Sequence, residues 1–222
     1  MKLYMEDIMK DTIIKKLNER YTLEKREMGE LGKIHKGMFQ FDSEAYEIKD
    51  IGNLFIMDMK AMLGLMKMET IVITPLMKDL SFCNLDAVKA AGNYTGMFEM
   101  YDTALKETDL SAFDTIRKKY SDLPDYQAES RWYDEYRLSS CIAKKGKKID
   151  VETEAMLEEC LDLYLDLLDK VPSCDPNKKK EKTAIYVNRL INEGGAAVDS
   201  MNKLIGKELT SKLIKEFMYH ID

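Results

Sequence analysis

An aspartate inside an apolar stretch is the first residue of the sequence whose type and position could do chemistry. Asp86 lies between Leu85 and Ala87 in the run PLMKDLSFCNLDAV, residues 75–88. Its carboxyl group can belong to a turn, pair with a cation at the surface, or line a pocket. In a pocket, desolvation raises the pKa of a carboxyl group toward neutrality, as a proton donor requires. The stretch therefore predicts either a structural acid or a general acid.

Two preceding runs carry polar groups that a neighbouring strand could bring to Asp86. In LFIMDMK, strand alternation places Asp58 either inward or on an ordinary solvent face. In KMETIV, Glu69 and Thr70 are adjacent, so alternation sends them to opposite faces. An inward Asp86 can approach either run, which makes Asp58 and Thr70 candidates for the same site.

Other kinds of catalytic site are not indicated. The sequence has no G-x-x-x-x-G-K-[ST] phosphate loop, no G-x-G-x-x-G after a strand and no G-x-S-x-G motif. Its two histidines, His35 and His220, have no partner at zinc-ligand spacing, so no metal site is expected. The four cysteines form no C-x-x-C pair, which is typical of a reducing compartment; they are Cys83, Cys141, Cys160 and Cys174.

Charge and the N-terminal segment limit the partners. The 222 residues include 34 Lys and Arg and 40 Asp and Glu, and this net charge of −6 disfavours nucleic acid as a partner. Residues 1–21 are typical of an amphipathic helix and not of an export signal, and no run of roughly 18 apolar residues predicts a membrane span. We therefore expect a cytoplasmic protein without a membrane partner. The lysine-rich runs 144–148 and 177–182 indicate solvated charge or a docking patch for an acidic protein.

The elements that must position Asp86 are a helix, a block of strands and a helical C-terminal half. Runs 53–60 and 66–74 flank the link AMLGL and predict an antiparallel hairpin. The other expected elements are a helix over 2–20, short or irregular strands over 22–51, strands over 81–92 and 94–102, a helix over 109–123, a strand over 136–144, and helices over 150–171, 174–191 and 207–221. This order predicts an α+β fold, a three-layer α/β/α sandwich with a central antiparallel sheet flanked by helices. Without a repeat or clean linker, residues 1–222 are expected to form a single domain.

The stretch 54–90 resembles the core of the ferredoxin-dependent bilin reductases, relatives of red chlorophyll catabolite reductase. In that family a hairpin leads into a proline-containing segment, a Leu-x-Phe, and an aspartate followed by two small apolar residues. The corresponding residues here are Pro75, Leu80, Ser81, Phe82, Asp86, Ala87 and Val88. More loosely, SRWYDEYRLSSCI over 130–142 and the terminal run 202–222 resemble the family's tryptophan-led strand and last helices. Order and spacing match over about residues 45–220.

This resemblance implies a linear tetrapyrrole held between the sheet and the C-terminal helices. It implies no bound metal or flavin, single electrons from a reduced ferredoxin, and protons from protein acids. Asp86 matches the family's principal proton donor. Asp58 falls where many members carry a glutamate, and Thr70 falls where bilin reductases often carry a histidine.

Two departures from the family pattern bear on activity. A threonine donates a hydrogen bond but cannot shuttle protons near neutral pH as an imidazole does, so Thr70 weakens the case for a histidine-dependent reduction. In NEGGAAVD, residues 192–199, only Glu193 can replace the family's second acid there. The paired glycines 194 and 195 predict either a helix break or a very close contact.

The remaining candidates for contact with a substrate are aromatic or basic. They are Phe82, Arg131, Trp132, Arg137 and Lys203, the cations being alternatively ordinary surface residues and the aromatics plain core. The leading interpretation is a protein that binds a linear tetrapyrrole and reduces it, with Asp86, Asp58, Thr70 and Glu193 at the site. One alternative is a carrier or sensor of such a ligand without catalysis. Another is an interaction protein without a small ligand, with its 16 methionines as an adaptable surface.

Overall fold

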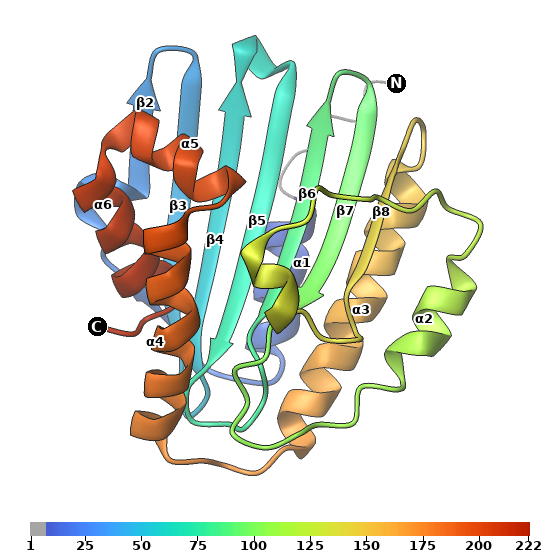
Figure 1. The fold of residues 1–222 in the computed structure, drawn as a ribbon, viewed down its shortest axis with the longest axis vertical. Coiled ribbons are helices and arrows are strands. Elements are labelled where there is room, and N and C mark those ends of the chain that lie inside the picture. Colours follow the sequence, from blue (N-terminus) through green and yellow to red (C-terminus); the bar gives the residue numbers. More distant parts are fainter. Residues whose placement is uncertain (1–7) are drawn as a thin grey trace.

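The computed structural model describes residues 8–222, in which helices cover both faces of one sheet (Figure 1). The strands are β1 (Leu23–Arg26), β2 (Lys33–Lys36), β3 (Phe39–Ile48), β4 (Gly52–Ala61), β5 (Met66–Pro75), β6 (Cys83–Ala90), β7 (Asn93–Met100) and β8 (Ile142–Gly146). The helices are α1 (Ile8–Asn18), α2 (Phe113–Lys119), α3 (Asp150–Lys170), α4 (Pro176–Glu193), α5 (Ala196–Ile205) and α6 (Lys207–Lys212). Three short 3₁₀ helices, η1 (Gly29–Gly32), η2 (Met62–Gly64) and η3 (Trp132–Tyr136), and one π-helix, η4 (Leu213–Met218), complete the fold.

The eight strands of the described chain form an antiparallel sheet in the order β1-β3-β4-β5-β6-β7-β8, with β2 also paired to β3. The predicted hairpin and the two strands after it are confirmed as β4 to β7. The region 22–51 is more regular than expected, because β3 is a strand of ten residues that pairs along the whole of β4. The antiparallel α/β/α sandwich is thus the fold of the protein.

Each face of the sheet has its own apolar core. Leu54 and Ile56 pack with α1 and α3, whereas Phe55 and Met57 face the layer formed by α4, α5, α6 and η4. We call the second side the C-terminal face, and in Figure 1 its helices lie in front of the sheet. Gly96 brings α3 close on the first side, since a Cβ there would lie 2.2 Å from Thr153 Cγ2. Because successive side chains of a strand point to opposite faces, each side chain of the sheet packs against either α1 and α3 or the C-terminal helices.

Several boundaries differ from the sequence prediction: α5 is an additional helix, and α6 and η4 together replace the single helix expected over 207–221. The last strand begins at Ile142 and not near 136, because residues 132–136 form η3 and lie over the C-terminal face. The helix expected over 109–123 is shorter, since α2 spans only Phe113–Lys119. Of the first helix, Ile8–Asn18 is seen and residues 1–7 lie outside the described chain.

Local chemistry explains where α4 starts and stops. Asp175 is its N-cap and accepts hydrogen bonds from the backbone N–H groups of Asn177 and Lys178, and Pro176 occupies the first turn. At the other end Gly194 has φ +77°, and a Cβ there would lie 2.6 Å from Asp199 Oδ1. The paired glycines therefore break the helix, which is one of the two outcomes expected for them. No helix within residues 8–222 has the length and apolar character needed to cross a membrane.

Candidate functional site

Asp86 lies on the C-terminal face of β6 with a hydrogen bond to each carboxyl oxygen. The register places Thr70 of β5 directly opposite, and Thr70 Oγ1 donates to Asp86 Oδ1 over 2.5 Å. Asn84, two residues earlier on the same face, donates from Nδ2 to Oδ2 over 2.6 Å. Both donors are neutral, so they orient the carboxyl group without supplying a countercharge.

The protonation of Asp86 is set chiefly by its surroundings. Burial raises the pKa of Asp86 from 3.8 to about 6; the hydrogen bonds from Thr70 and Asn84 oppose this rise, and the charge of Glu99 adds to it. The side chain is nevertheless partly exposed. A carboxyl group that titrates close to neutrality and reaches the surface can give up a proton and regain one from water.

This raised pKa predicts that Asp86 lowers stability at neutral pH. The folded state binds the proton more tightly than the unfolded chain, so the contribution is favourable below the unfolded pKa of 3.8 and is lost as pH rises through about 6. At about pH 7, Asp86→Asn should raise the free energy of unfolding by about 2 kcal/mol, and near pH 4 the two proteins should differ little. Urea unfolding across this range measures the difference.

Exposed Asp122→Asn is the control for loss of a carboxyl group at the surface. A difference between wild type and Asp86→Asn that is constant with pH would contradict the raised pKa.

A second carboxylate, Glu99 of β7, lies on the same face beside Asn84. It is 7% exposed, and its Oε1 is 2.6 Å from Arg137 Nη2 while its Oε2 accepts a hydrogen bond of 2.8 Å from the Tyr101 hydroxyl. Sequence reasoning missed Glu99, although alternation along β7 places it with Met97 and Tyr101. The site therefore holds one carboxyl group among neutral donors and another paired with a guanidinium group.

Aromatic rings form one wall next to these acids. Phe82 is fully buried, and its ring centre lies 5.3 Å from that of Tyr101, 5.1 Å from Tyr186 and 5.0 Å from Tyr219. Burial, with the charges of Asp86 and Glu99, raises the pKa of Tyr219. Its hydroxyl group therefore stays protonated at neutral pH. Phe82 therefore packs in the core beneath the site and is not accessible to a ligand.

A cavity of about 250 Å³ opens beside the acids, between β7, β8 and the segment before η3. Met97, which pairs with Asp86 across the strands, and Glu99 lie on its wall together with two guanidinium groups, those of Arg117 and Arg137. Sites for small molecules usually have volumes of roughly 300–1,000 Å³. At about 250 Å³ this cavity is smaller than such sites, and half-buried Met97 on its wall is a flexible side chain that can move to enlarge it.

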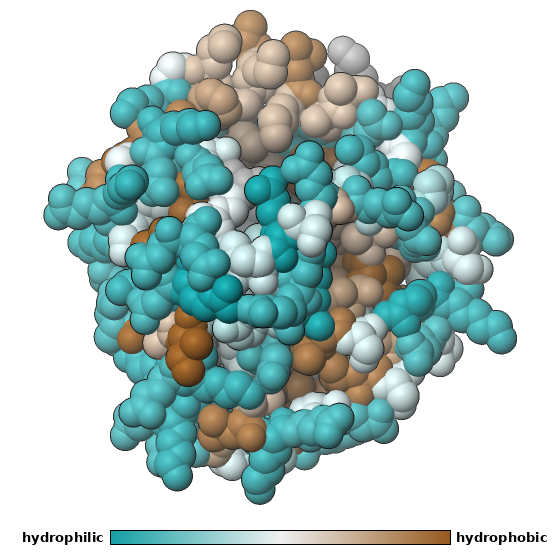
Figure 2. All heavy atoms as spheres, in the orientation of Figure 1, coloured by the Kyte–Doolittle hydropathy of each residue, from teal (hydrophilic) through white to brown (hydrophobic). Residues whose placement is uncertain are grey.

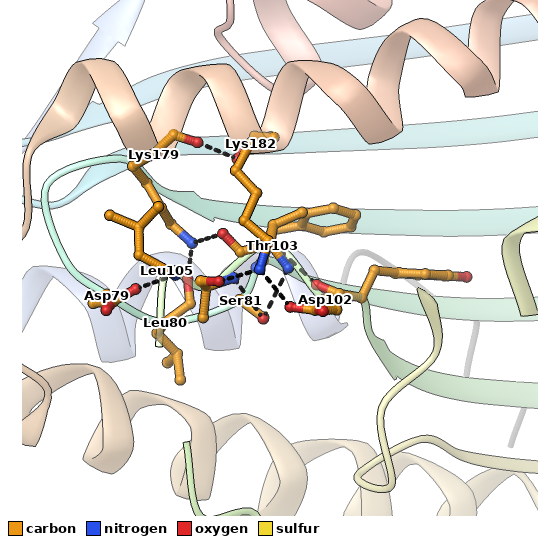
Figure 3. Close-up of polar contacts among 12 residues, drawn as sticks. Asp79, Leu80, Ser81, Asp102, Thr103, Leu105, Lys179 and Lys182 are labelled. Atoms are coloured by element: carbon orange, nitrogen blue, oxygen red, sulfur yellow. Dashed lines mark hydrogen bonds and ion pairs between the residues drawn. The ribbon is translucent and has the colours of Figure 1, made fainter. Parts of the chain in front are cut away.

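The loop that leads into β6 is fixed from α4 (Figure 3). Lys179 is fully buried, and its Nζ donates to the carbonyl oxygens of Leu80 and Thr103 over 2.7 Å and 2.6 Å. Ser81 Oγ accepts hydrogen bonds from the backbone N–H groups of Thr103 and Ala104. These contacts hold the start of β6, and with it the position of Asp86, relative to the end of β7.

Comparison with known proteins identifies a solved structure with a similar fold. No protein-family model matches the sequence, and no curated protein matches it. The crystal structure of phytochromobilin synthase from tomato in complex with biliverdin matches with a TM-score of 0.75 over 96% of this chain and 82% of that one. The two proteins share a fold. At 15% sequence identity the likeness concerns the fold alone, and it agrees with the architecture that the resemblance implied.

Not all predicted site residues lie near Asp86. Thr70 does, and Arg137 lies on the cavity wall. Asp58 lies on the opposite face of the sheet, because it pairs with Glu69, which alternation directs toward the α1–α3 side. The expectation that Asp58 shares a site with Asp86 is therefore corrected.

Glu193 belongs to a surface network at the end of α4. Its Oε1 lies 2.6 Å from Nε of Arg189, whose guanidinium group is 4.7 Å from the centre of the Trp132 ring. The pairing with Arg189 lowers the pKa of Glu193. Glu193 is thus held as an ionised surface acid and does not join Asp86.

The other three candidates lie at or near the surface. Trp132 is half-buried and donates from Nε1 to the Gly194 carbonyl oxygen over 2.8 Å. Arg131 is exposed, with Nη2 3.4 Å from Glu129, and Lys203 is exposed at the end of α5. Within residues 8–222, no group of three or more His, Cys, Asp or Glu side chains is arranged to hold a metal ion.

Proposed function

We propose that the protein binds a linear tetrapyrrole over the C-terminal face of its sheet and reduces it with electrons from a reduced ferredoxin. Asp86 carries this proposal, since it is a partly exposed carboxyl group with a pKa of about 6. It lies in a fold shared with a protein whose crystal structure contains biliverdin. Arg117 and Arg137 at the cavity can bind propionate carboxylates if these replace or share their present partners, which are Asp114 for Arg117 and Glu99 and Asp134 for Arg137.

In the proposed reaction, one double bond of the tetrapyrrole takes up two electrons and two protons. Two reduced ferredoxin molecules each supply one electron. Protonated Asp86 donates a proton to the ligand, and the carboxylate regains one from water through its exposed edge for the second transfer. Thr70 and Asn84 hold the carboxyl group in one orientation, and Glu99 favours its protonated form.

Binding and reduction are tested separately. Addition of the purified protein to biliverdin should shift and sharpen the visible absorption of the pigment at micromolar concentrations, because the conformations of a bound tetrapyrrole are restricted. Absence of a shift would count against binding. Anaerobic incubation with ferredoxin, ferredoxin reductase and NADPH should then bleach or shift the bound pigment.

A non-enzymatic carrier or sensor is the second candidate, and Thr70 is the observation that favours it. The hydroxyl group of Thr70 holds Asp86 but cannot act as a proton shuttle near neutral pH. A carrier should give the absorption shift without any change on addition of reduced ferredoxin. Asp86→Asn should then leave affinity unaltered and have no turnover to affect.

A further inference from the structure

Four chain connections lie level at one end of the sheet. Phe39 pairs with Ala61, Ala61 with Met66, and Met66 with Ala90, so the strand ends are in register. The connections are residues 36–39, 60–67, 89–93 and 145–149. The last lies at this end because Gly146 of β8 pairs with Tyr94 of β7, and it leads into Asp150, the first residue of α3. In Figure 1 this end is uppermost, and we call it the turn end of the sheet.

The turn end is basic in a chain with a formal net charge of −6. Its connections contain seven lysines and no Asp or Glu. All of the lysines except half-buried Lys67 are exposed; the seven are Lys36, Lys60, Lys67, Lys89, Lys145, Lys147 and Lys148. Lys60, Lys67 and Lys89 are directly opposite one another on adjacent strands. Like charges in such positions repel. Asp58 and Glu69, two residues along the same strands on the same face, offset part of this repulsion, and an anionic surface would relieve the rest.

Large apolar side chains project from the same end. Leu63 is 98% exposed and Leu65 73%, with Met38 and Met62 also exposed beside them. Figure 2 shows these apolar atoms gathered at the top of the molecule. Met62 and Leu63 adopt left-handed backbone with φ of 51° and 57°, which costs roughly 1–2 kcal/mol per residue for side chains of this kind. The turn therefore holds Met62 and Leu63 in water at a cost in backbone energy.

We propose that the turn end docks on the surface of an anionic lipid bilayer, with Leu63 and Leu65 in the headgroup region and the lysines against lipid phosphates. Apolar side chains within a basic surface combine the two contributions that drive peripheral membrane binding. A nucleic acid matches the lysines but offers no complement to projecting leucines. A second copy of the chain would place lysines against lysines, which disfavours self-association. No membrane-spanning segment is needed for this docking.

The experiment is sedimentation with vesicles of phosphatidylcholine alone or with added phosphatidylglycerol, at low and high salt. Wild type should bind the anionic vesicles at least about tenfold more strongly, and high salt should reduce this binding. Leu63→Asn should weaken binding about tenfold. Asparagine tolerates the left-handed conformation, so this variant should unfold at or above the wild-type temperature and a loss of binding is not a loss of fold.

Lys60→Glu should weaken binding about tenfold as well. Two matched controls lie elsewhere, namely Ile185→Ser, at an apolar side chain of α4 that is 59% exposed, and Lys49→Glu in the turn between β3 and β4 at the opposite end of the sheet. Both should bind as wild type does. The proposal is overturned if anionic vesicles are not bound, if the turn-end variants bind like the controls, or if these substitutions abolish only self-association or binding to an acidic protein.

Discussion

Replacing Asp86 with asparagine is expected to slow tetrapyrrole reduction by roughly 100-fold or more, with affinity changed by less than about threefold. Asparagine keeps the shape of the side chain but has no proton to give at this pKa. The amide oxygen can accept from Asn84 and the amide nitrogen can donate to the Thr70 hydroxyl, which turns to accept, so the strand pair around the site is retained. Single-turnover bleaching of bound biliverdin measures the rate, and absorption titration measures the affinity. Because the same substitution is expected to stabilise the fold at neutral pH, slow turnover would not reflect unfolding.

Asp58→Asn is the matched control for this experiment. Asp58 lies one strand away from Thr70 but on the opposite face of the sheet, so the rate should remain within about twofold of wild type. Equal loss of rate in the two variants would contradict a site on the C-terminal face. An unchanged rate in Asp86→Asn would remove Asp86 from the proposed mechanism.

The contrast between Asp58 and Asp86 shows how far alternation can predict a site. Treating AMLGL, residues 61–65, as the whole link pairs Lys60 with Met66 and places Asp58 and Thr70 on one face. In the structure Ala61 pairs with Met66, so the link is one residue shorter and every side chain of β4 changes its partner. A one-residue change of register moves a side chain to the other face. The pattern of the strands predicted the hairpin, but the left-handed turn at Met62 and Leu63 set its register.

Contacts between distant segments explain what the sequence did not predict. Glu99 and Arg137 form their ion pair because the chain returns from β7 through α2 and η3 to the same sheet face, a route that no local pattern specifies. By contrast, the caps and periods that predicted α3 and α4 are local, and both helices were found near their expected bounds. Asp86 combines the two cases. Its strand, and Asn84 two residues earlier on that strand, follow from the local pattern, whereas contact with Thr70 depends on the register between β5 and β6.

Lys179 is a clearer case of a misleading local pattern. The pattern NKKKEK, residues 177–182, predicts solvated charge or a docking patch, yet Lys179 is fully buried with Thr183 and Val187 on the inner side of α4. Burial lowers the pKa of Lys179 to about 8, while the charge of Asp79 opposes that fall. Its ammonium group is retained because it is a donor to two carbonyl groups between the sheet and α4 (Figure 3).

We expect Lys179→Ala to lower the free energy of unfolding by about 4 kcal/mol, and Lys179→Met by about 2 kcal/mol. Methionine fills most of the space of the buried stem but leaves the Leu80 and Thr103 carbonyl oxygens without this donor; alanine adds a cavity. Removal of a buried charge offsets part of both losses. Urea unfolding at neutral pH measures them, and exposed Lys178→Ala, one residue away, should change stability by less than about 0.5 kcal/mol.

The pH dependence of stability distinguishes the contribution of the Lys179 ammonium group from that of its apolar stem. Because the pKa of Lys179 is lowered from 10.5 to about 8, the cost of burying the charge is complete below pH 8 and disappears as pH rises toward 10.5. Wild type should therefore gain stability relative to Lys179→Met between these values, while groups common to both proteins, such as the buried cysteines, cancel in the difference. A constant difference would mean that the pKa of Lys179 is not lowered from 10.5 in the folded state, and that its two carbonyl contacts are made by an ammonium group that stays charged over this whole pH range.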